Sequence, residues 1–385
     1  MKKIIMFTGG IETQEYFTLQ LAKAFEKIGH DIYLYRLNEG ERDFPDLCRF
    51  IEEKNTVMIT FNFHGLNFEE PFYNDDLSLW EVLEIPCYNI VLDHPFYYHK
   101  FLKTMPPNYI HISIDRGHEN YMRRFFPQIK LGPFLPLAGT EIHNIPMKER
   151  SRNIVFTGNY TPPHQFDQYI TRINEDYTNF YHGIIDDLIA HPSLGMDETF
   201  EKHLRLEMKG LSDDDLKTCM ENMIFIDLYV RFYFRGLAVR TLAEHDFPIH
   251  IYGGGWDLLN CKCPENVILG GSANSLECLE VISDSRISLN VMPWFKDGAH
   301  DRIFNSMLNG TVSLSDDSLW LRENITDGKE IAYYSLSEIE QLPSIVDGLM
   351  SDTNRLEEIA QNGYRKAKTS HTWECRAKVL EGLIL

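Results

Sequence analysis

The chain has 385 residues, a formal net charge of −20 and an apolar fraction of 43%. A single hydrophobic core stops growing near about 250–300 residues, so this length predicts two domains. The apolar fraction is too high for a disordered chain. The strong negative charge argues against nonspecific binding to nucleic acid or to anionic membranes, and we expect no nucleic-acid partner.

The sequence contains no run that approaches the about 18 apolar residues of a membrane-spanning helix, so no transmembrane segment is expected. Residues 1–10 (MKKIIMFTGG) begin like a signal peptide, but their apolar run is short and we interpret it as a first buried strand. The seven cysteines are scattered and odd in number, which is typical of reduced thiols in a cytoplasmic protein. Cys261 and Cys263 have no second Cys or His pair at a spacing suited to zinc.

The first 135 residues alternate short apolar runs with amphipathic ones. Residues 3–7 form an apolar run that ends at a glycine pair, and residues 17–28 carry apolar side chains at helical spacing. Further strands are expected at residues 31–37, 57–61, 87–92 and 109–114, with helices near 44–54, 77–83 and 119–126. This alternation predicts a parallel, doubly wound sheet.

The second half shows the same alternation with an interruption. Residues 131–146 are rich in proline and turn residues and are interpreted as a linker. Residues from about 162 to 245 lack strand signals and contain several helix-like stretches, which predicts a helical insertion. Strand signals resume at 249.

The sequence therefore predicts an α/β protein made of two Rossmann-like lobes. The expected domains are an N-terminal lobe at 1–147, a C-terminal lobe at 148–370 that contains the insertion at about 162–245, and a last helix at 371–385. That helix is expected to pack back on the N-terminal lobe.

Residues 297–316 (DGAHDRIFNSMLNGTVSLSD) indicate a polar loop, a short helix, a turn at Gly310 and a buried strand that ends at Asp316. Such a loop suits a phosphorylated ligand, because the free N–H groups and the positive dipole end of a helix N-terminus attract anions. Arg302 would add a forked, charge-assisted contact. The pattern equally fits an ordinary loop–helix–strand unit.

This segment resembles the donor-sugar loop of group-1 glycosyltransferases with the GT-B architecture, and in particular the CgeB-like (spore-maturation-type) glycosyltransferases. The resemblance lies in Arg302-Ile303-Phe304-Asn305, in Gly310 and in Ser315-Asp316. Three further stretches resemble the same family in the same order, at residues 153–159 (NIVFTGN), 249–257 (IHIYGGGWD) and 371–376 (HTWECR). The resemblance implies a nucleotide-diphosphate sugar as donor substrate, with UDP as the expected nucleotide and no cofactor.

One position departs from the family pattern. Many retaining relatives have an acidic residue at the position of Asn305, and in those relatives the acidic residue binds the donor ribose or sugar. An asparagine can hydrogen-bond a hydroxyl but carries no charge. The departure leaves open the donor and whether the reaction inverts or retains configuration.

Ligands of open parallel sheets bind at the carboxyl ends of the strands, so polar residues just after predicted strands are the site candidates. Gly9 and Gly10 follow the first strand and permit close backbone approach, although a tight turn alone would explain them. They do not form a complete G-x-G-x-x-G, so an NAD fingerprint is absent. The donor-binding candidates are Gly9, Gly10, Thr157, Gly158, Asn159, Gly253, Gly254, Gly255, Asp297, Gly298, His300, Asp301, Arg302, Asn305 and Asp316.

The catalytic candidates follow strands of the first lobe. Asp93 and His94 combine a carboxylate with an imidazole, and either group could take a proton from an acceptor hydroxyl. His64 follows the preceding strand and could take a proton in the same way. A structural interpretation remains open for all three residues, because Asp93 could simply cap the turn before Pro95.

No catalytic metal is expected. The N–H groups of residues 298–301 and the Arg302 side chain would stabilise a leaving diphosphate without a metal ion. An Asp-x-Asp motif of the metal-dependent type is not evident, and Asp213, Asp214 and Asp215 have the position of helix caps.

These features predict a cytoplasmic, metal-independent glycosyltransferase that moves a sugar from a nucleotide-diphosphate sugar to a hydroxyl of a glycan, protein or lipid acceptor. The helical insertion is expected to serve acceptor recognition or the contacts of a homodimer. Two alternatives remain open at this point: a sugar-nucleotide epimerase of the same architecture, and a non-catalytic protein that binds a sugar or a nucleotide. A dehydrogenase is disfavoured by the missing glycine fingerprint.

Overall fold

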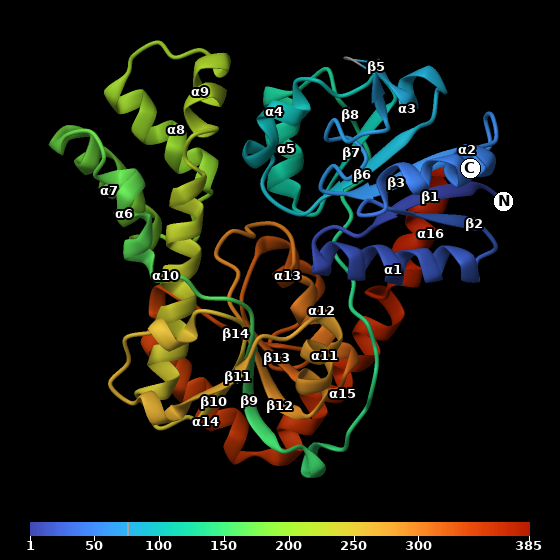
Figure 1. Cartoon of the computed structure of the whole chain (residues 1–385). Coiled ribbons are helices and arrows are strands. Elements are labelled where there is room, and N and C mark those ends of the chain that lie inside the picture. Colours follow the sequence, from blue (N-terminus) through green and yellow to red (C-terminus); the bar gives the residue numbers. More distant parts are fainter. Residues whose placement is uncertain (75–76) are drawn as a thin grey trace. The chain divides into compact units, whose positions relative to one another are not determined.

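The computed structural model describes residues 1–74 and 77–385 and divides the chain into two compact units (Figure 1). Unit 1 comprises Met1–Ala138 and His371–Leu385, and unit 2 comprises Gly139–Ser370. Unit 2 thus begins earlier than the expected boundary at residue 148. The reason is local, because the backbone N–H groups of Thr140 and Ile142 donate to the side-chain oxygens of Asn305 and Asn309, each at 2.9 Å.

Unit 1 contains a six-stranded sheet in the order β2-β1-β3-β6-β7-β8, and all its strand pairs are parallel. Its strands are β1 (Lys3–Thr8), β2 (Asp31–Arg36), β3 (Thr56–Phe61), β6 (Cys87–Val91), β7 (Tyr109–Ser113) and β8 (Lys130–Leu131). Strands β3, β6 and β7 are buried at every residue, as expected for a parallel sheet covered on both faces.

The helices of unit 1 follow the predicted alternation. They are α1 (Glu12–Lys27), α2 (Phe44–Phe50), α3 (Leu79–Val82), α4 (His99–Leu102), α5 (Arg116–Phe125) and α16 (Trp373–Ile384). The helix predicted at residues 77–83 is shorter in the structure. Residues Leu77–Ser78 form β5, which pairs with β4 (Tyr73–Asn74). The helix begins only after Ser78, because the Ser78 hydroxyl caps α3 by accepting the Glu81 N–H at 3.1 Å.

Helix α16 belongs to unit 1 although it is the last element of the chain. It packs against α1, where the rings of Phe17 and Trp373 lie 5.3 Å apart. His30 Nε2 lies 3.2 Å from a carboxylate oxygen of Glu381, and the Arg376 guanidinium donates to the Leu137 carbonyl at 2.8 Å. The terminal segment is therefore joined to unit 1 by both apolar and polar contacts.

Unit 2 contains a second parallel six-stranded sheet, in the order β11-β10-β9-β12-β13-β14. Its strands are β9 (Arg152–Thr157), β10 (Ile249–Tyr252), β11 (Val267–Gly271), β12 (Ser285–Asn290), β13 (Val312–Asp316) and β14 (Ala332–Tyr334). In chain order this is 3-2-1-4-5-6, the doubly wound arrangement that opens a ligand crevice between its first and fourth strands, here β9 and β12.

The helices of unit 2 after β10 are α11 (Ser275–Ser283), α12 (Asp301–Leu308), α13 (Leu319–Asn324), α14 (Leu342–Ser351) and α15 (Thr353–Ser370). Between β9 and β10 the chain forms the predicted helical insertion. It consists of α6 (Asp167–Ile170), α7 (Glu175–Ala190), α8 (Met196–Glu207), α9 (Asp213–Met220) and α10 (Ile224–Ala243). Figure 1 shows α6 to α9 gathered around one end of the long α10, which runs toward the sheet.

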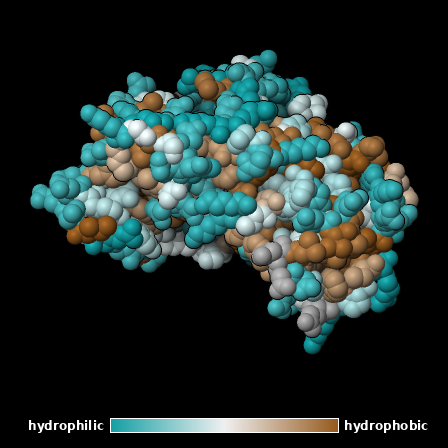
Figure 2. All heavy atoms as spheres, turned by 90° about the horizontal axis from the view of Figure 1, so that it is seen from above, coloured by the Kyte–Doolittle hydropathy of each residue, from teal (hydrophilic) through white to brown (hydrophobic). Residues whose placement is uncertain are grey.

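Teal residues cover most of the face drawn in Figure 2, and hydrophobic residues gather in one area at its right-hand side. Unit 1 contributes several exposed apolar side chains, among them Phe68, Leu77, Val82 and Leu83. Single exposed apolar residues are normal on soluble proteins and assign no function here.

Arg150 fixes the amino ends of two strands of unit 2. Its buried guanidinium donates to the carbonyls of Ile145 (3.0 Å), Ser285 (2.7 Å) and Asn309 (2.9 Å) and to the Thr311 hydroxyl (2.6 Å). Burial lowers its pKa to about 10, so the group remains charged near neutral pH. Its contacts join the segment before β9 to the first residues of β12 and to the turn before β13.

We expect Arg150→Ala to destabilise the protein by on the order of 3–5 kcal/mol, because it leaves several buried acceptors without a donor. Urea unfolding of the variant would measure the loss. Lys148→Ala, an exposed neighbour, serves as the control and should change stability by less than about 0.5 kcal/mol. An equal, small effect of both variants would contradict a structural role for Arg150.

Candidate functional site

The N-terminus of α12 is a compact polar centre. His300 Nδ1 lies 2.8 Å from Asp301 Oδ1 and 3.3 Å from the backbone nitrogen of Arg302. The imidazole ring contacts the rings of Trp294 and Phe295, each at a centroid distance of 5.9 Å. Burial, reinforced by the charge of Arg302, lowers the pKa of His300 to about 4, so this imidazole is neutral near pH 7.

Arg302 joins the carboxyl ends of the two strands that flank the crevice position. Its guanidinium donates to Asn290 Oδ1 at 3.2 Å, at the end of β12, and lies 5.6 Å from the ring centroid of Phe156 in β9. A Cβ on Gly158 would lie only 3.0 Å from Arg302 Nη2, so the glycine leaves room for the guanidinium. The structure thus brings the predicted Gly158 and Arg302 together.

Two further arginines reach this place from α10. The Arg231 guanidinium lies 4.0 Å from the Trp294 ring centroid, and that of Arg235 lies 5.1 Å from it. Arg235 also donates to the backbone carbonyl of Asn159 at 3.0 Å. We call Arg231, Arg235 and Arg302 the arginine cluster. The first two were not among the predicted site residues, and the signal that could have found them is a pair of arginines at i, i+4 within an otherwise apolar, aromatic helix.

The arginine cluster concentrates positive charge in a poorly solvated place. Arg235 is 7% exposed, and burial together with the charges of Arg302 and Arg231 lowers its pKa well below the ordinary value. Asp227 pairs with Arg231 at 2.8 Å, and Asp301 lies beside Arg302. The three guanidiniums are close enough for their charges to lower one another's pKa. Because buried like charges repel each other, this arrangement favours an added anion.

The predicted glycine loops pack against each other at the same edge of the sheet. A Cβ on Gly253 would lie 2.3 Å from the Gly158 carbonyl oxygen, and one on Gly255 would lie 2.1 Å from that of Tyr160. The Gly254 N–H donates to Asn159 Oδ1 at 2.9 Å. These glycines therefore have a packing reason as well as the predicted ligand role, which stays a prediction.

Asn305 and Gly298 make structural contacts. Asn305 Oδ1 accepts the Thr140 N–H at 2.9 Å, and its amide nitrogen donates to Asp301 Oδ2 at 2.9 Å. The Gly298 carbonyl accepts the Ser318 hydroxyl at 2.6 Å. Asn305 thus fastens α12 to the start of unit 2, and its predicted contact with the donor stays a prediction.

Asp316 ends β13 and is 4% exposed. Its Oδ1 accepts the Met292 N–H at 2.8 Å, and burial raises its pKa to about 7. The carboxyl group lines a cavity of about 250 Å³ at the carboxyl ends of β13 and β14. Thr157, Asp297 and Asp316 all belong to loops or strand ends at this edge of the sheet, as predicted for the donor-binding set.

In unit 1, the predicted residues also lie at strand ends. The His64 ring lies over Gly10, where a Cβ would approach the ring to 2.7 Å, and burial lowers the pKa of His64. The Gly9 N–H donates to a carboxylate oxygen of Glu15 at 2.8 Å. The two glycines therefore serve close packing within unit 1.

Asp93 and His94 have different surroundings. Asp93 Oδ2 accepts hydrogen bonds from the Asn62 amide at 3.2 Å and from the Tyr98 hydroxyl at 2.9 Å. His94 Nδ1 accepts the Phe96 N–H at 3.3 Å. An imidazole that accepts through Nδ1 carries its proton on Nε2, whereas a carboxylate keeps several lone pairs. Asp93 therefore keeps lone pairs that could accept a further hydrogen bond.

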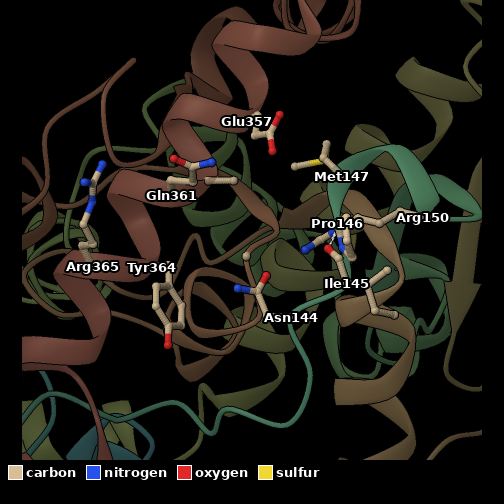
Figure 3. A pocket seen from close by; sticks show the side chains of 11 residues that line it. Asn144, Ile145, Pro146, Met147, Arg150, Glu357, Gln361, Tyr364 and Arg365 are labelled. Atoms are coloured by element: carbon tan, nitrogen blue, oxygen red, sulfur yellow. Dashed lines mark hydrogen bonds between the residues drawn. The ribbon is translucent and has the colours of Figure 1, made fainter.

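A second cavity of about 410 Å³ lies at the opposite edge of the unit 2 sheet (Figure 3). Its lining includes Gly310, which precedes β13, and Arg150, which precedes β9, so it is an amino-end cavity. Tyr364, Arg365 and Glu357 from α15 form its other wall. Its position separates it from the loops that were predicted to bind the donor.

Among the described residues, no group of three or more His, Cys, Asp or Glu side chains has the arrangement of a metal site. In the same part of the chain, the helices are all too short or too polar to cross a membrane.

Part of the sequence and the whole fold are similar to known proteins. Residues 235–382 match a family model described as "Glycosyl transferase-like", whereas no curated protein matches the chain. The fold is similar to sucrose-phosphate synthase from Thermosynechococcus elongatus (12% identity, TM-score 0.51, covering 100% of this chain and 98% of that one). It is also similar to HepE of Anabaena in complex with UDP-glucose (9% identity, TM-score 0.54, covering 100% and 99%).

TarM is similar over 88% of this chain (14% identity, TM-score 0.50), and the match spans 57% of the length of TarM. The predicted fold of two Rossmann-like lobes in the GT-B class is confirmed. The part of the chain that resembles a glycosyl transferase domain begins within α10 of unit 2 and extends into α16 of unit 1, in agreement with the predicted transferase. The narrower resemblance to CgeB-like enzymes stays a prediction.

Asp316 should make stability depend on pH. In the unfolded chain an aspartate carboxyl ionises near its ordinary pKa of 3.8, whereas the buried one stays protonated up to about pH 7. At lower pH the carboxyl is neutral in both states and no charge has to be buried. The free-energy cost of burying the ionised carboxylate appears and grows as the pH rises between these two values. As the pH rises from about 4 to about 7.5, the free energy of unfolding of Asp316→Asn should increase, relative to that of the original protein, by on the order of 2–4 kcal/mol.

Urea unfolding at several pH values measures this difference. The control is Asp347→Asn, which makes the same substitution at an exposed position. A constant difference for Asp316→Asn would show that the Asp316 carboxyl ionises normally in the folded protein.

Proposed function

We propose that this protein is a glycosyltransferase that moves a sugar from a UDP-sugar to a hydroxyl of a glycan, protein or lipid acceptor without a metal ion. The observation that carries the proposal is the arginine cluster at the carboxyl ends of β9 and β12. A diphosphate would form charge-assisted hydrogen bonds with guanidiniums that otherwise repel one another. HepE, which has the same fold, was solved with UDP-glucose, and this supports UDP as the nucleotide.

The cluster would act mainly on the leaving group. As the bond to the sugar breaks, negative charge builds up on the diphosphate. Fixed guanidiniums in a poorly solvated site stabilise that charge without rearranging at the moment of reaction. Arg235 and Arg302 are the best placed for this role, because the backbone of Asn159 and the side chain of Asn290 orient them.

Metal independence follows from the same electrostatics. A metal ion in metal-dependent transferases neutralises the diphosphate, and here three guanidiniums would supply that charge. Turnover should therefore persist in the presence of EDTA. A rate that is abolished by EDTA and restored by Mg²⁺ or Mn²⁺ would refute this part of the proposal.

Unit 1 would serve the acceptor. In an inverting reaction a protein base takes the proton of the acceptor hydroxyl, and we assign this role to Asp93 before His94 or His64, because Asp93 retains lone pairs for a new hydrogen bond. In a retaining reaction no such base is required, and the arginine cluster would contribute most of the rate enhancement.

Arg302→Ala should weaken UDP binding by on the order of 2–4 kcal/mol, because it removes a charge-assisted contact to the diphosphate. Isothermal titration with UDP measures this loss. Arg365→Ala is the matched control, since Arg365 lines the amino-end cavity (Figure 3) and should not affect UDP affinity. Equal UDP affinity of Arg302→Ala and the original protein would remove the arginine cluster from donor binding.

Asp93→Asn should reduce turnover by about 10²–10⁴-fold while UDP affinity stays unchanged, because the amide cannot accept a proton. Release of UDP in the presence of acceptor measures turnover, and His94→Gln is the comparison variant. A large loss in His94→Gln with little effect in Asp93→Asn would transfer the role to His94. Interconversion of the UDP-sugar without any acceptor would instead identify an epimerase.

A further inference from the structure

The cavity at the carboxyl ends of β13 and β14 is built from three parts of unit 2. These are the end of β13 at Asp316, the segments around Lys296 and Ser337, and Pro192 and Ser193 of the helical insertion. The complete lining is Pro192, Ser193, Phe295, Lys296, Asp316, Asp317, Ser318, Leu319, Arg322, Ser335, Leu336 and Ser337. We call it the β13–β14 cavity.

The β13–β14 cavity is next to the arginine cluster. Asn290, which accepts from Arg302, donates through its amide nitrogen to the Ser315 hydroxyl at 2.9 Å, and Ser315 precedes Asp316. On the other side, Phe295 lines the cavity and contacts the His300 ring. A group attached to a diphosphate at the cluster therefore has this cavity as a neighbouring space.

The size of the cavity suits one ring. Its volume of about 250 Å³ is below the range of about 300–1,000 Å³ that is usual for sites of drug-sized ligands. A complete nucleotide sugar would not fit. The space is thus appropriate for one end of the donor, which is either the sugar or the nucleoside.

The lining favours the sugar. Hydroxyls of Ser193, Ser335 and Ser337 can both donate and accept hydrogen bonds, and the carboxyl groups of Asp316 and Asp317 can accept them, as a polyhydroxylated ring requires. Its charges are largely compensated within the protein. Arg322 pairs with Asp317, and the Lys296 ammonium donates to backbone carbonyls.

The helical insertion takes part through Lys296. The ammonium group of this residue donates to the carbonyl of Pro192, in the turn between α7 and α8, and also to that of Pro293. In the same turn the Leu194 N–H donates to the His191 carbonyl at 3.0 Å. The turn is therefore held beside the end of β13, where it limits the space available to a ligand.

We propose that the β13–β14 cavity holds the sugar ring of the donor, and that Asp316 and the α7–α8 turn select a neutral hexosyl group over an anionic one. The inference rests on the proposed function and gives the insertion a part in donor selection. The Arg322 and Lys296 cations of the lining are engaged by Asp317 and by backbone carbonyls. Above about pH 7 the carboxylate of an anionic sugar such as a hexuronate would therefore meet an ionised Asp316, and like charges at short range repel each other.

Isothermal titration with UDP, UDP-glucose and UDP-glucuronate tests this inference. At about pH 8, where an ionised Asp316 repels an anionic sugar, we expect Asp316→Asn to improve the affinity for UDP-glucuronate relative to UDP-glucose by about tenfold. Ser193→Trp, which places a bulky group on the wall of the cavity, should weaken UDP-glucose relative to UDP by about tenfold. Affinity for UDP itself should stay the same in both variants.

The control is Ser351→Trp, a bulky substitution at the exposed end of α14 that should leave every affinity unchanged. If UDP binds normally but neither ratio changes, the sugar lies elsewhere and the cavity inference fails while the proposed function stands. If both variants weaken UDP as much as UDP-glucose, the cavity holds the nucleoside and the sugar assignment is wrong. If the original protein binds no UDP compound, the proposed function fails and this inference fails with it.

Discussion

The gathering of three guanidinium groups in a poorly solvated place, two of them beside the Trp294 indole, is the constraint on which unit 2 depends. Taking cations out of water is costly unless hydrogen bonds and counter-charges compensate for the loss. The surrounding elements provide this compensation in part, through Asp227, the Asn159 carbonyl and Asn290. The like charges nevertheless remain close together, because Arg302 and Arg231 both lower the pKa of Arg235. An anion at this place would relieve their mutual repulsion.

The same constraint explains why the insertion belongs to the candidate site of unit 2. Helix α10 brings Arg231 and Arg235 to the sheet edge and carries α6 to α9 at its other end (Figure 1). The turn between α7 and α8 returns to the same edge, where Lys296 holds it. The insertion is thus connected to the segment before α12 at two places. Its removal would take away two of the three guanidiniums as well as a wall of the β13–β14 cavity.

The features that could be predicted from the sequence are those set by patterns within a few neighbouring residues. The alternation of strands and helices predicted both sheets, and the loop before Arg302 indicated an anion site, because strand ends and helix starts have signatures within a few residues. Arg231 and Arg235 escaped prediction because they lie in an apolar helix far from the loop, where long basic side chains are usually explained by their position at the surface. The glycines at 253 and 255 have a packing reason that becomes visible only when the neighbouring loop is in place.

The position of Trp294 has a practical consequence. Of the five tryptophans, Trp80, Trp256, Trp320 and Trp373 are buried in the two cores, whereas Trp294 is partly exposed and lies close to two guanidiniums. Its indole emission senses the electric field of those cations. An anion that reaches them changes this field, so the protein carries an intrinsic optical reporter beside its arginines. Occupancy of the site can therefore be followed by fluorescence in the unlabelled protein.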